Sequence, residues 1–350
     1  MKAAVMYGPN DIRYEEMDRP NCPQGGFILK VEAIGLCGSD IRNMTTDSKQ
    51  GKYPHVYGHE MVGIIDEVTP ETPDKWKEGM RVFVHPASHC MVCETCRSGH
   101  TENCTNREYN TDRQGGFAQY APVTKMQAER DSVYVIPDDV SFDLATLGEP
   151  LSSVYACQQN INVTVGQSVV IIGAGPIGCF HAKMAKVRGA KKVIMVEINE
   201  TRLERSRQYG VDVCIHSAEE DAKERILEET GGLGADIVIS ANPSNRAQAE
   251  SIFYAKRGGI IVIFGGVKKG TLTALDTNYL HYHNLWVYGH FGASSMQIQE
   301  SYELAISKDF HGEELITHVL PLSQINQAID LARFGQAVKI VLHPWEEKTE

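Results

Sequence analysis

The N-terminal half of the chain shows short apolar runs with a β-type pattern. Gly and Pro interrupt these runs at close intervals over residues 1–152. Runs of this length and spacing predict the strands of a mostly antiparallel, barrel-like domain. The predicted strands are Phe27–Ala33, Gly63–Val68, Arg81–Val84, Gly116–Pro122 and Ser132–Ile136.

From about Gly166 the pattern changes to continuous apolar runs that alternate with helix-like segments. Such runs are typical of strands buried on both faces, so their alternation with helices predicts a parallel, doubly wound sheet. The predicted strands are Ser168–Ile172, Lys192–Glu197, Val211–Ile215, Ala235–Ser240 and Gly259–Phe264. The predicted helices are a segment from a glycine turn to Arg188, then Thr201–Tyr209, Ala218–Thr230 and Asn245–Lys256.

The segment after about Gly289 contains two predicted helices, Met296–Ser307 and Gln324–Ala332, and a predicted strand, Val338–Leu342. Because the alternating pattern has already supplied its strands, we expect this tail to return to the first domain. The sequence therefore predicts an α/β chain with a mostly-β domain over 1–152 and 290–350 and a doubly wound domain over 153–289.

Composition and charge narrow the function. Among 350 residues there are 34 Lys+Arg and 45 Asp+Glu, a net charge of −11 that would repel phosphate backbones, so we expect no nucleic-acid partner. No uninterrupted apolar run reaches the roughly 18 residues of a membrane span. The N-terminal residues also meet Gly-Pro-Asn too early for a signal peptide. We therefore expect a cytoplasmic protein with no membrane partner.

A glycine-rich motif lies between a predicted strand and a predicted helix. The segment 173–178 reads GAGPIG and matches G-x-G-x-x-G in the context that a dinucleotide site requires. Its glycines let the backbone approach a pyrophosphate, whose charge a helix N-terminus favours. Glu197, 22 residues after Gly175, can accept hydrogen bonds from ribose hydroxyls and would repel a 2′-phosphate, which favours NAD over NADP. A bare glycine turn is the alternative. The candidate cofactor-binding residues are Gly173, Gly175, Pro176, Ile177, Gly178, Glu197 and Arg202.

Four of the nine cysteines crowd into a loop-like segment, about residues 88–106. Cys90, Cys93, Cys96 and Cys104 have the spacing C-x2-C-x2-C-x7-C, which suits tetrahedral thiolate coordination of one structural Zn²⁺. An iron–sulfur cluster, disulfides in an oxidising compartment and a nucleic-acid zinc ribbon are the alternatives. The acidic residues of the segment disfavour the last of these.

A second group of metal-type residues is scattered along the chain. Cys37 lies in GLCGSD, His59 and Glu60 lie in YGHE, and Glu149 lies in GEP. All are competent zinc ligands, and a catalytic zinc uses three protein ligands plus an exchangeable position. A single Cys is more often a small buried hydrophobe, and a single His a hydrogen-bonded core residue. Spacing alone does not bring these residues together.

Taken jointly, these motifs resemble the zinc-dependent medium-chain dehydrogenase/reductase family. The closer resemblance is to its polyol branch, which includes sorbitol, galactitol-1-phosphate and threonine dehydrogenases. The resemblance implies a GroES-like catalytic domain, a Rossmann NAD-binding domain, two Zn²⁺ and NAD, and a homodimer or homotetramer. It also implies reversible oxidation of a secondary alcohol of a polyol, sugar alcohol or sugar-alcohol phosphate to the ketone. Threonine-type amino-alcohol oxidation and a non-catalytic NAD-binding protein are the alternatives.

The resemblance also implies roles for individual residues. Cys37 and His59 match the two constant ligands of the catalytic zinc. Glu60 would be a ligand or a near neighbour, and Glu149 would bind zinc directly or through water, with exchange between the two left open. Ser39 would accept or pass on the substrate proton. Asp40 is either a residue that orients His59 or a turn-forming aspartate.

The sequence departs from the family pattern at three places. Arg42 stands where many relatives carry a proton-conducting histidine, and Arg cannot shuttle protons at neutral pH. Together with Lys49 and Lys52, Arg42 indicates either a site for an anionic group of the substrate or a solvated basic loop. Where relatives carry a Thr-Gly element, this chain reads Ser240-Ala-Asn242-Pro. Where relatives carry a small residue near the expected nicotinamide, this chain has His290.

Overall fold

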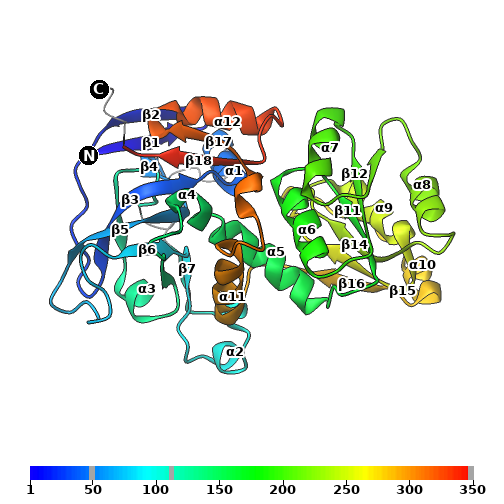
Figure 1. Cartoon of the computed structure of the whole chain (residues 1–350), viewed down its shortest axis with the longest axis horizontal. Coiled ribbons are helices and arrows are strands. Elements are labelled where there is room, and N and C mark those ends of the chain that lie inside the picture. The colour runs from blue at the N-terminus through cyan, green and yellow to red at the C-terminus, as the bar shows by residue number, and fades with distance from the viewer. Residues whose placement is uncertain (47–51, 110–113, 346–350) are drawn as a thin grey trace. The chain divides into compact units, whose positions relative to one another are not determined.

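The computed structural model describes residues 1–46, 52–109 and 114–345. Its contacts divide the chain into two compact units, Met1–Ser153 with Ala293–Glu350, and Val154–Gly292 (Figure 1). Each unit has its own sheet and its own core. Within the described residues, no helix has both the length and the apolar character that a membrane crossing requires.

The first unit is built on antiparallel β-structure. β3 (Phe27–Gly35) lies at the centre of its main sheet and is almost completely buried. Its partners on one side are β5 (Glu60–Val68), β6 (Arg81–Val84) and β10 (Val133–Val135), and β9 (Tyr120–Val123) also pairs with it. The other strands are β1 (Lys2–Gly8), β2 (Asp11–Glu16) and β4 (His55–Val56) in a three-stranded sheet, and β7 (Ala87–Ser88) with β8 (Glu108–Tyr109).

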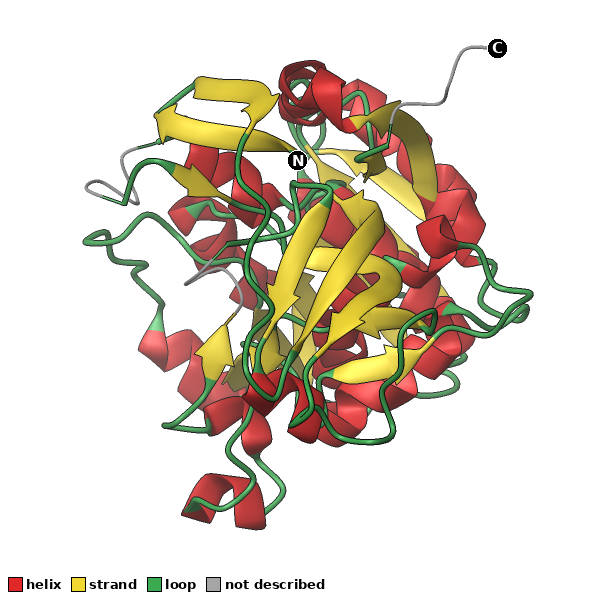
Figure 2. Cartoon of the chain, turned by 90° about the vertical axis from the view of Figure 1, so that its left-hand side faces the viewer, coloured by secondary structure: helices red, strands yellow, loops and turns green. Residues whose placement is uncertain are grey.

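The C-terminal tail completes the main sheet of this unit. β18 (Lys339–His343) pairs antiparallel with β3, Val341 opposite Gly35, and parallel with β17 (Ile316–Pro321). The tail therefore returns to the sheet formed by the first residues. The helices of the unit are α1 (Gly38–Thr45), α2 (Glu94–Arg97), η2 (Thr101–Asn103), α3 (Lys125–Glu129), α4 (Phe142–Ala145), α11 (Ser295–Ala305), η6 (Gly312–Leu315), η7 (Leu322–Gln324) and α12 (Ile325–Arg333). Figure 2 shows the short α2 on loops that project from the sheet.

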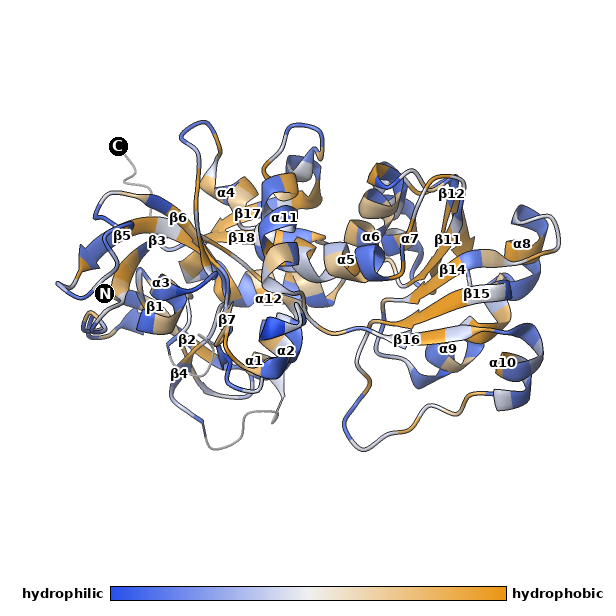
Figure 3. Ribbon diagram, turned by 90° about the horizontal axis from the view of Figure 1, so that it is seen from below, coloured by the Kyte–Doolittle hydropathy of each residue, from blue (hydrophilic) through white to orange (hydrophobic). Residues whose placement is uncertain are grey.

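The second unit contains a six-stranded parallel sheet. Its strand order is β13 (Val213–His216), β12 (Lys192–Glu197), β11 (Ser168–Ile172), β14 (Ala235–Ser240), β15 (Ala255–Ile263) and β16 (Trp286–Gly289). The order reverses at β11, which pairs with both β12 and β14. Figure 3 shows that these strands form the apolar interior of the unit. The helices are α6 (Pro176–Val187), α7 (Glu200–Ser206), η4 (Arg207–Tyr209), α8 (Ala222–Glu229), α9 (Asn245–Glu250), η5 (Ser251–Tyr254) and α10 (Thr277–His283); α5 (Gly148–Asn160) runs from the first unit into the second.

The predicted helix Asn245–Lys256 is wrong at its C-terminal end. The α-helix stops at Glu250, and a 3-10 turn leads into β15, which begins at Ala255 rather than Gly259. The first residues of β15 are Ala-Lys-Arg-Gly-Gly, which carry no strand pattern; Ala255 pairs with Ala235 of β14, and the register shifts before pairing resumes at Ile260. β16 was also missing from the predicted strands.

Candidate active site and metal centres

Three of the scattered metal-type residues converge in the first unit. Cys37 directly precedes α1 and follows β3, while His59 directly precedes β5. Because Gly35 pairs with Glu60 in the antiparallel β3–β5 ladder, the end of β3 and the start of β5 lie side by side. The donor atoms of Cys37, His59 and Glu60 all lie within 4.8 Å of one another. A thiolate, an imidazole and a carboxylate at this separation fit a zinc ion.

The neighbours of this cluster orient two of its donor atoms. Asp40 is 1% exposed, and its Oδ1 lies 3.0 Å from His59 Nδ1, so that Nε2 is the imidazole nitrogen left for a metal. Burial alone would lower the pKa of His59, but the charges of Asp40, Cys37 and Glu149 outweigh burial and raise that pKa well above its ordinary value. The Ser39 hydroxyl donates to Cys37 Sγ over 3.4 Å. Asp40 is therefore a buried partner of His59 and not a surface turn residue.

Glu149 lies at the start of α5, beside the cluster. Its Oε1 is 3.8 Å from His59 Nε2, although it does not join the group of mutually close donor atoms. Burial raises the pKa of Glu149 to about 7; His59 lowers it and Glu60 raises it further. The structure thus places two carboxylates near His59, as the family resemblance implied, and the two differ in their contacts.

Glu60 has a partner that the sequence analysis missed. The Lys339 ammonium, from the first residue of β18, contacts Glu60 Oε2, and both side chains are almost completely buried, at 3% and 0% exposed. Gly35 makes room for this pair, because a Cβ at that position would overlap Glu60 Oε2. The only local signal was a lysine at the start of an apolar run, which is usually a surface residue at a strand end.

The four clustered cysteines also converge. Their sulfur atoms all lie within 4.8 Å of one another, and the Cys90–Cys104, Cys93–Cys104 and Cys90–Cys96 Sγ separations are 3.5, 3.9 and 4.0 Å. Sulfurs around a tetrahedral zinc at ~2.3 Å would lie roughly 3.8 Å apart. All nine cysteines of the chain are free, so no disulfide forms within the cluster. A hydrogen bond from Thr95 is the main cause of a pKa of about 5 for Cys93, which favours the thiolate.

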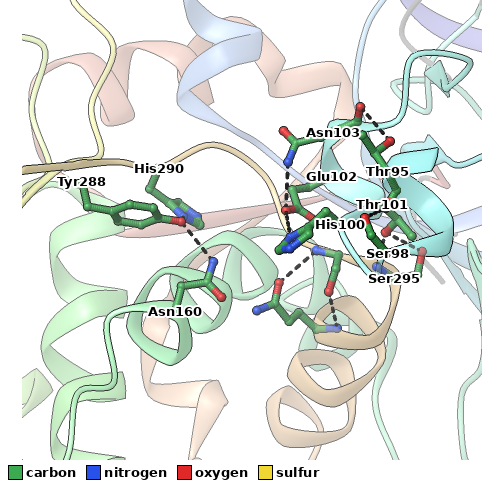
Figure 4. A network of polar contacts seen from close by, with 12 residues as sticks. Thr95, Ser98, His100, Thr101, Glu102, Asn103, Asn160, Tyr288, His290 and Ser295 are labelled. Atoms are coloured by element: carbon green, nitrogen blue, oxygen red, sulfur yellow. Dashed lines mark hydrogen bonds and ion pairs between the residues drawn. The ribbon is translucent and has the colours of Figure 1, made fainter. Parts of the chain in front are cut away.

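The cysteine lobe is connected to α11 by buried polar contacts within the first unit. The Thr101 hydroxyl accepts a hydrogen bond from the backbone N–H of Ser295 over 2.7 Å, and the two hydroxyls lie 3.0 Å apart. His89 Nδ1 lies 3.2 Å from the Ser295 hydroxyl. Figure 4 shows Thr101 and Ser295 together with the His100–Glu102 contact on the lobe surface. These contacts give the lobe an attachment other than its metal ligands.

The glycine motif of the second unit forms a tight turn between β11 and α6. Gly173 has a φ of +108°, and a Cβ on Gly178 would overlap the Gly173 carbonyl oxygen, so glycine is needed at both positions. Gly175 caps α6, and Pro176 is its first residue. Ile177 follows it in the first turn. The free N–H groups at this helix start can bind a phosphate.

Glu197 closes this turn from the neighbouring strand. It is 8% exposed; its Oε2 accepts a hydrogen bond from Ala174 N–H over 2.7 Å, and its Oε1 accepts from Ile198 and Asn199 N–H groups. The carboxylate therefore shapes the glycine turn as well as offering its remaining lone pairs to a ligand. Arg202 lies in the first turn of α7 and is partly exposed.

His290, one of the departures from the family pattern, directly follows the carboxyl end of β16. Asn160 donates to the Tyr288 hydroxyl over 3.1 Å, and that hydroxyl lies 3.3 Å from His290 Nδ1 (Figure 4). The His290 ring stacks on Phe264 at 5.2 Å and is 8% exposed. His290 is thus held at the strand edge where parallel sheets bind ligands. The basic residues of the other departure, Arg42 and Lys52, are exposed, and Lys49 lies outside the described residues.

Comparisons with known proteins place this architecture in a family. Residues 23–138 match the family model "Alcohol dehydrogenase GroES-like domain", and residues 176–307 match "Zinc-binding dehydrogenase". The chain is 28% identical to a sorbitol dehydrogenase of Bombyx mori (97% of this chain, 98% of the relative) and 30% identical to an L-threonine 3-dehydrogenase of Symbiobacterium thermophilum (94% and 93%). An alcohol dehydrogenase of Escherichia coli CFT073, solved with NADH, superposes with a TM-score of 0.86 at 26% identity (98% and 99% coverage).

The chain belongs to the zinc-dependent medium-chain dehydrogenase/reductase family, in its polyol branch. It is an oxidoreductase of the zinc alcohol dehydrogenase type, and these relationships argue against the non-catalytic alternative. The predicted fold class, a GroES-like domain with a Rossmann domain, is confirmed.

Proposed function

We propose that this enzyme catalyses the reversible, NAD-linked oxidation of a secondary alcohol of a polyol, sugar alcohol or sugar-alcohol phosphate to the ketone. The convergence of Cys37, His59 and Glu60 within 4.8 Å, with Glu149 alongside, carries the proposal. Cys37, His59 and one of the two carboxylates would make the three protein ligands of a zinc ion with one exchangeable position. The likeness to sorbitol dehydrogenase supports a polyol substrate.

The residues of the site have separate tasks in this reaction. Zinc supplies a Lewis acid for the substrate hydroxyl, and the nicotinamide supplies the hydride acceptor. Cys37 and His59 would hold the metal, while Asp40 keeps the imidazole in the required tautomer. The Ser39 hydroxyl would hold or pass the proton that leaves the substrate. Either Glu60, which has an oxygen within 4.8 Å of the Cys37 and His59 donor atoms, or Glu149, whose Oε1 lies 3.8 Å from His59 Nε2, would complete the ligand set.

The cofactor site is assigned to the turn between β11 and α6. We assign pyrophosphate binding to the segment 173–178, from Gly173 to Gly178 with Pro176 and Ile177 at the helix start. Glu197 would receive the adenosine ribose and disfavour a 2′-phosphate, and Arg202 would contact the ribose or the adenine. The NADH bound to the similar Escherichia coli structure supports NAD as the cofactor.

We assign the second zinc to Cys90, Cys93, Cys96 and Cys104. Four sulfur ligands leave no position for water or substrate, so this zinc would be structural. Because the lobe has few apolar contacts beyond its own cysteines, metal binding would supply much of its folding energy.

Amino-alcohol oxidation is the second candidate function. It is favoured by the 30% identity to an L-threonine 3-dehydrogenase over 94% of this chain. A threonine substrate needs a carboxylate to bind its ammonium group, whereas a polyol needs uncharged donors and acceptors. A phosphorylated polyol would call on cationic residues, of which Arg42 and Lys52 are the candidates.

A substrate panel tests these proposals together. Polyols, polyol phosphates and threonine are incubated with NAD, and NADH absorbance is followed, with zinc content measured by mass spectrometry. We expect about two zinc ions per chain and turnover of polyols. Cys37→Ser should abolish turnover, while Cys22→Ser, a cysteine outside both clusters, should not. Full activity after loss of the metal at Cys37 would refute the zinc mechanism, and turnover of threonine alone would favour the second candidate.

We also propose that the chain forms a homodimer or homotetramer through β16. This strand is the last of its sheet, and it exposes Trp286 (72%) and Val287 (41%). An exposed apolar edge strand invites pairing with another strand, and a two-fold axis would satisfy both copies at once. Light scattering should give a multiple of the 38.8 kDa chain mass, and Trp286→Lys should lower it. A monomeric wild-type protein would refute this assembly.

A further inference from the structure

A second histidine, His85, lies beside the candidate zinc site. It directly follows β6, in which Phe83 pairs with Val62 of β5 in an antiparallel ladder. Two residues further along each strand, this register places His85 opposite Glu60 at the start of β5. Residues two apart on a strand share a face of the sheet, so the side chains of His85 and Glu60 belong to the face on which Phe83 lies.

The same face leads to the start of α5. The ring of His85 meets the ring of Phe83 edge to face, with centroids 6.4 Å apart, and a Cβ on Gly148 would lie 3.1 Å from Phe83 Cε1. Glu149 is the next residue of the chain. His85 is 7% exposed and His59 is 8% exposed, and His59 is close enough to lower the pKa of His85. His85 is not one of the mutually close donor atoms of the cluster, so it borders the site without being a metal ligand.

Hydrogen bonds fix both the backbone and the tautomer of His85. Its N–H donates to the Ser132 carbonyl over 2.8 Å, and its own carbonyl accepts from Gln127 Nε2 over 3.4 Å. The Ala87 N–H donates to His85 Nδ1 over 3.2 Å, and the Ala87 carbonyl already accepts from the Ser132 hydroxyl. A hydrogen on Nδ1 would face the Ala87 N–H, so the neutral ring carries its hydrogen on Nε2.

His85 offers this Nε2–H group as an uncharged donor. Burial is the main cause that lowers the pKa of His85 to about 3, and His89 and His59 lower it further, so the ring is neutral around pH 7. Within the described residues Nε2 has no hydrogen-bond partner, and it is not one of the completely buried atoms that lack a partner. Nε2 therefore reaches open space, where a ligand can accept its hydrogen bond.

We propose that His85 is a specificity-determining residue that donates a hydrogen bond from Nε2 to a hydroxyl on the substrate carbon next to the reacting one. The inference rests on the proposed function, since it concerns the substrate of that site. A hydroxyl oxygen accepts this bond, whereas an ammonium group has only N–H donors and would place donor against donor. His85 therefore favours vicinal diols over the amino alcohols of the second candidate function.

The test removes one hydroxyl from the substrate and one imidazole from the enzyme. Butane-2,3-diol and butan-2-ol differ only by the hydroxyl on the neighbouring carbon. Because a neutral hydrogen bond is lost, His85→Leu should lower the preference for the diol, measured as the ratio of the two kcat/KM values, by about threefold to tenfold. His318→Leu is the matched control, because it replaces a partly buried histidine of β17 in the same unit and should keep the wild-type preference.

A second variant and a binding measurement separate this effect from misfolding. The amide of His85→Gln offers a donor and an acceptor, so this variant should keep more of the diol preference than His85→Leu does. Its acceptor should also raise the turnover of 3-aminobutan-2-ol relative to the diol, and this ratio serves if the leucine variant does not fold. Dissociation constants of the two alcohols from the enzyme–NADH complex, followed by NADH fluorescence, should change by the same factor as the kcat/KM ratio.

The outcomes distinguish this inference from the proposed function. A diol preference that is the same in His85→Leu and wild type, or an unchanged amino-alcohol ratio in His85→Gln, would overturn the role of His85 while leaving the dehydrogenase activity in place. A wild-type enzyme that prefers 3-aminobutan-2-ol to the diol would also overturn it. Wild-type protein that carries both zinc ions but oxidises neither these alcohols nor the polyols of the substrate panel would instead overturn the proposed function, and this inference with it.

Discussion

Asp40 offers the sharpest test of how the candidate zinc site is held together. Its Oδ1 lies 3.0 Å from His59 Nδ1, and the side chain is 1% exposed. Replacing Asp40 by Asn keeps the shape and one oxygen, but it removes the negative charge and adds an N–H group that can face the imidazole. The imidazole is then less basic and less firmly held with Nε2 toward the metal.

The expected magnitude follows from this contact. Removing the partner of a metal-binding histidine typically weakens metal affinity by 10- to 100-fold, which corresponds to about 1.4–2.7 kcal/mol. The upper part of this range applies here, because the contact is buried and charge-assisted and water cannot take over the lost role. The cysteine lobe has its own ligands and should keep its metal.

Competition with a chromophoric zinc chelator measures the effect. We expect one of two zinc ions to leave Asp40→Asn at a chelator concentration lower than for the wild type by a factor approaching about 100. Asp143→Asn is the control, because Asp143 Oδ1 lies 2.6 Å from His343 Nε2 in another Asp–His pair without metal-type neighbours. Equal chelator curves for Asp40→Asn and wild type would refute the orienting role of Asp40.

Three other predictions concern the second unit and the cysteine lobe. Burial lowers the pKa of His181 to about 3, so the folded chain keeps this residue neutral, whereas the unfolded chain binds a proton below about pH 6.5. The free energy of unfolding should therefore fall by about 2 kcal/mol between pH 7 and pH 5. Denaturant titrations at the two pH values should show a smaller loss for His181→Asn than for the wild type. An unchanged pH slope would contradict the prediction. Cys96→Ser should lose one zinc per chain and expose residues 88–106 to limited proteolysis, whereas an intact lobe with one zinc fewer would argue against metal-driven folding. Glu197→Gln should raise the NADP-to-NAD ratio of kcat/KM by about tenfold, because it removes the charge that repels a 2′-phosphate; a constant ratio would remove Glu197 from cofactor selection.

The sequence predicted the elements whose cause is local. The strands Ser168–Ile172, Lys192–Glu197 and Ala235–Ser240 have their predicted bounds, because each is a continuous apolar run between turn residues. β15 and β16 were harder to predict, since the first begins with Lys-Arg-Gly-Gly after Ala255 and the second exposes Trp286. Pairing with a neighbouring strand, rather than a local pattern, gives these segments their structure.

The sequence by itself determined the two motifs that lie within one short segment. The glycine turn of residues 173–178 and the cysteine lobe of residues 90–104 contain all their essential residues at close spacing, so chain connectivity alone brings them together. The strand order of the sheets and the partners of each carboxylate involve residues far apart in the sequence, so no short segment predicts them.

Only the tertiary structure decided the arrangement of the candidate active site. Cys37, His59, Glu149 and Lys339 come from distant parts of the chain, and the register of β3 with β5 and β18 brings Cys37, His59 and Lys339 together. A shift of one residue in either ladder would turn the side chains to the opposite face of the sheet. Register depends on the packing of whole strands, and no local pattern at Lys339 indicated that its charge would be buried against Glu60.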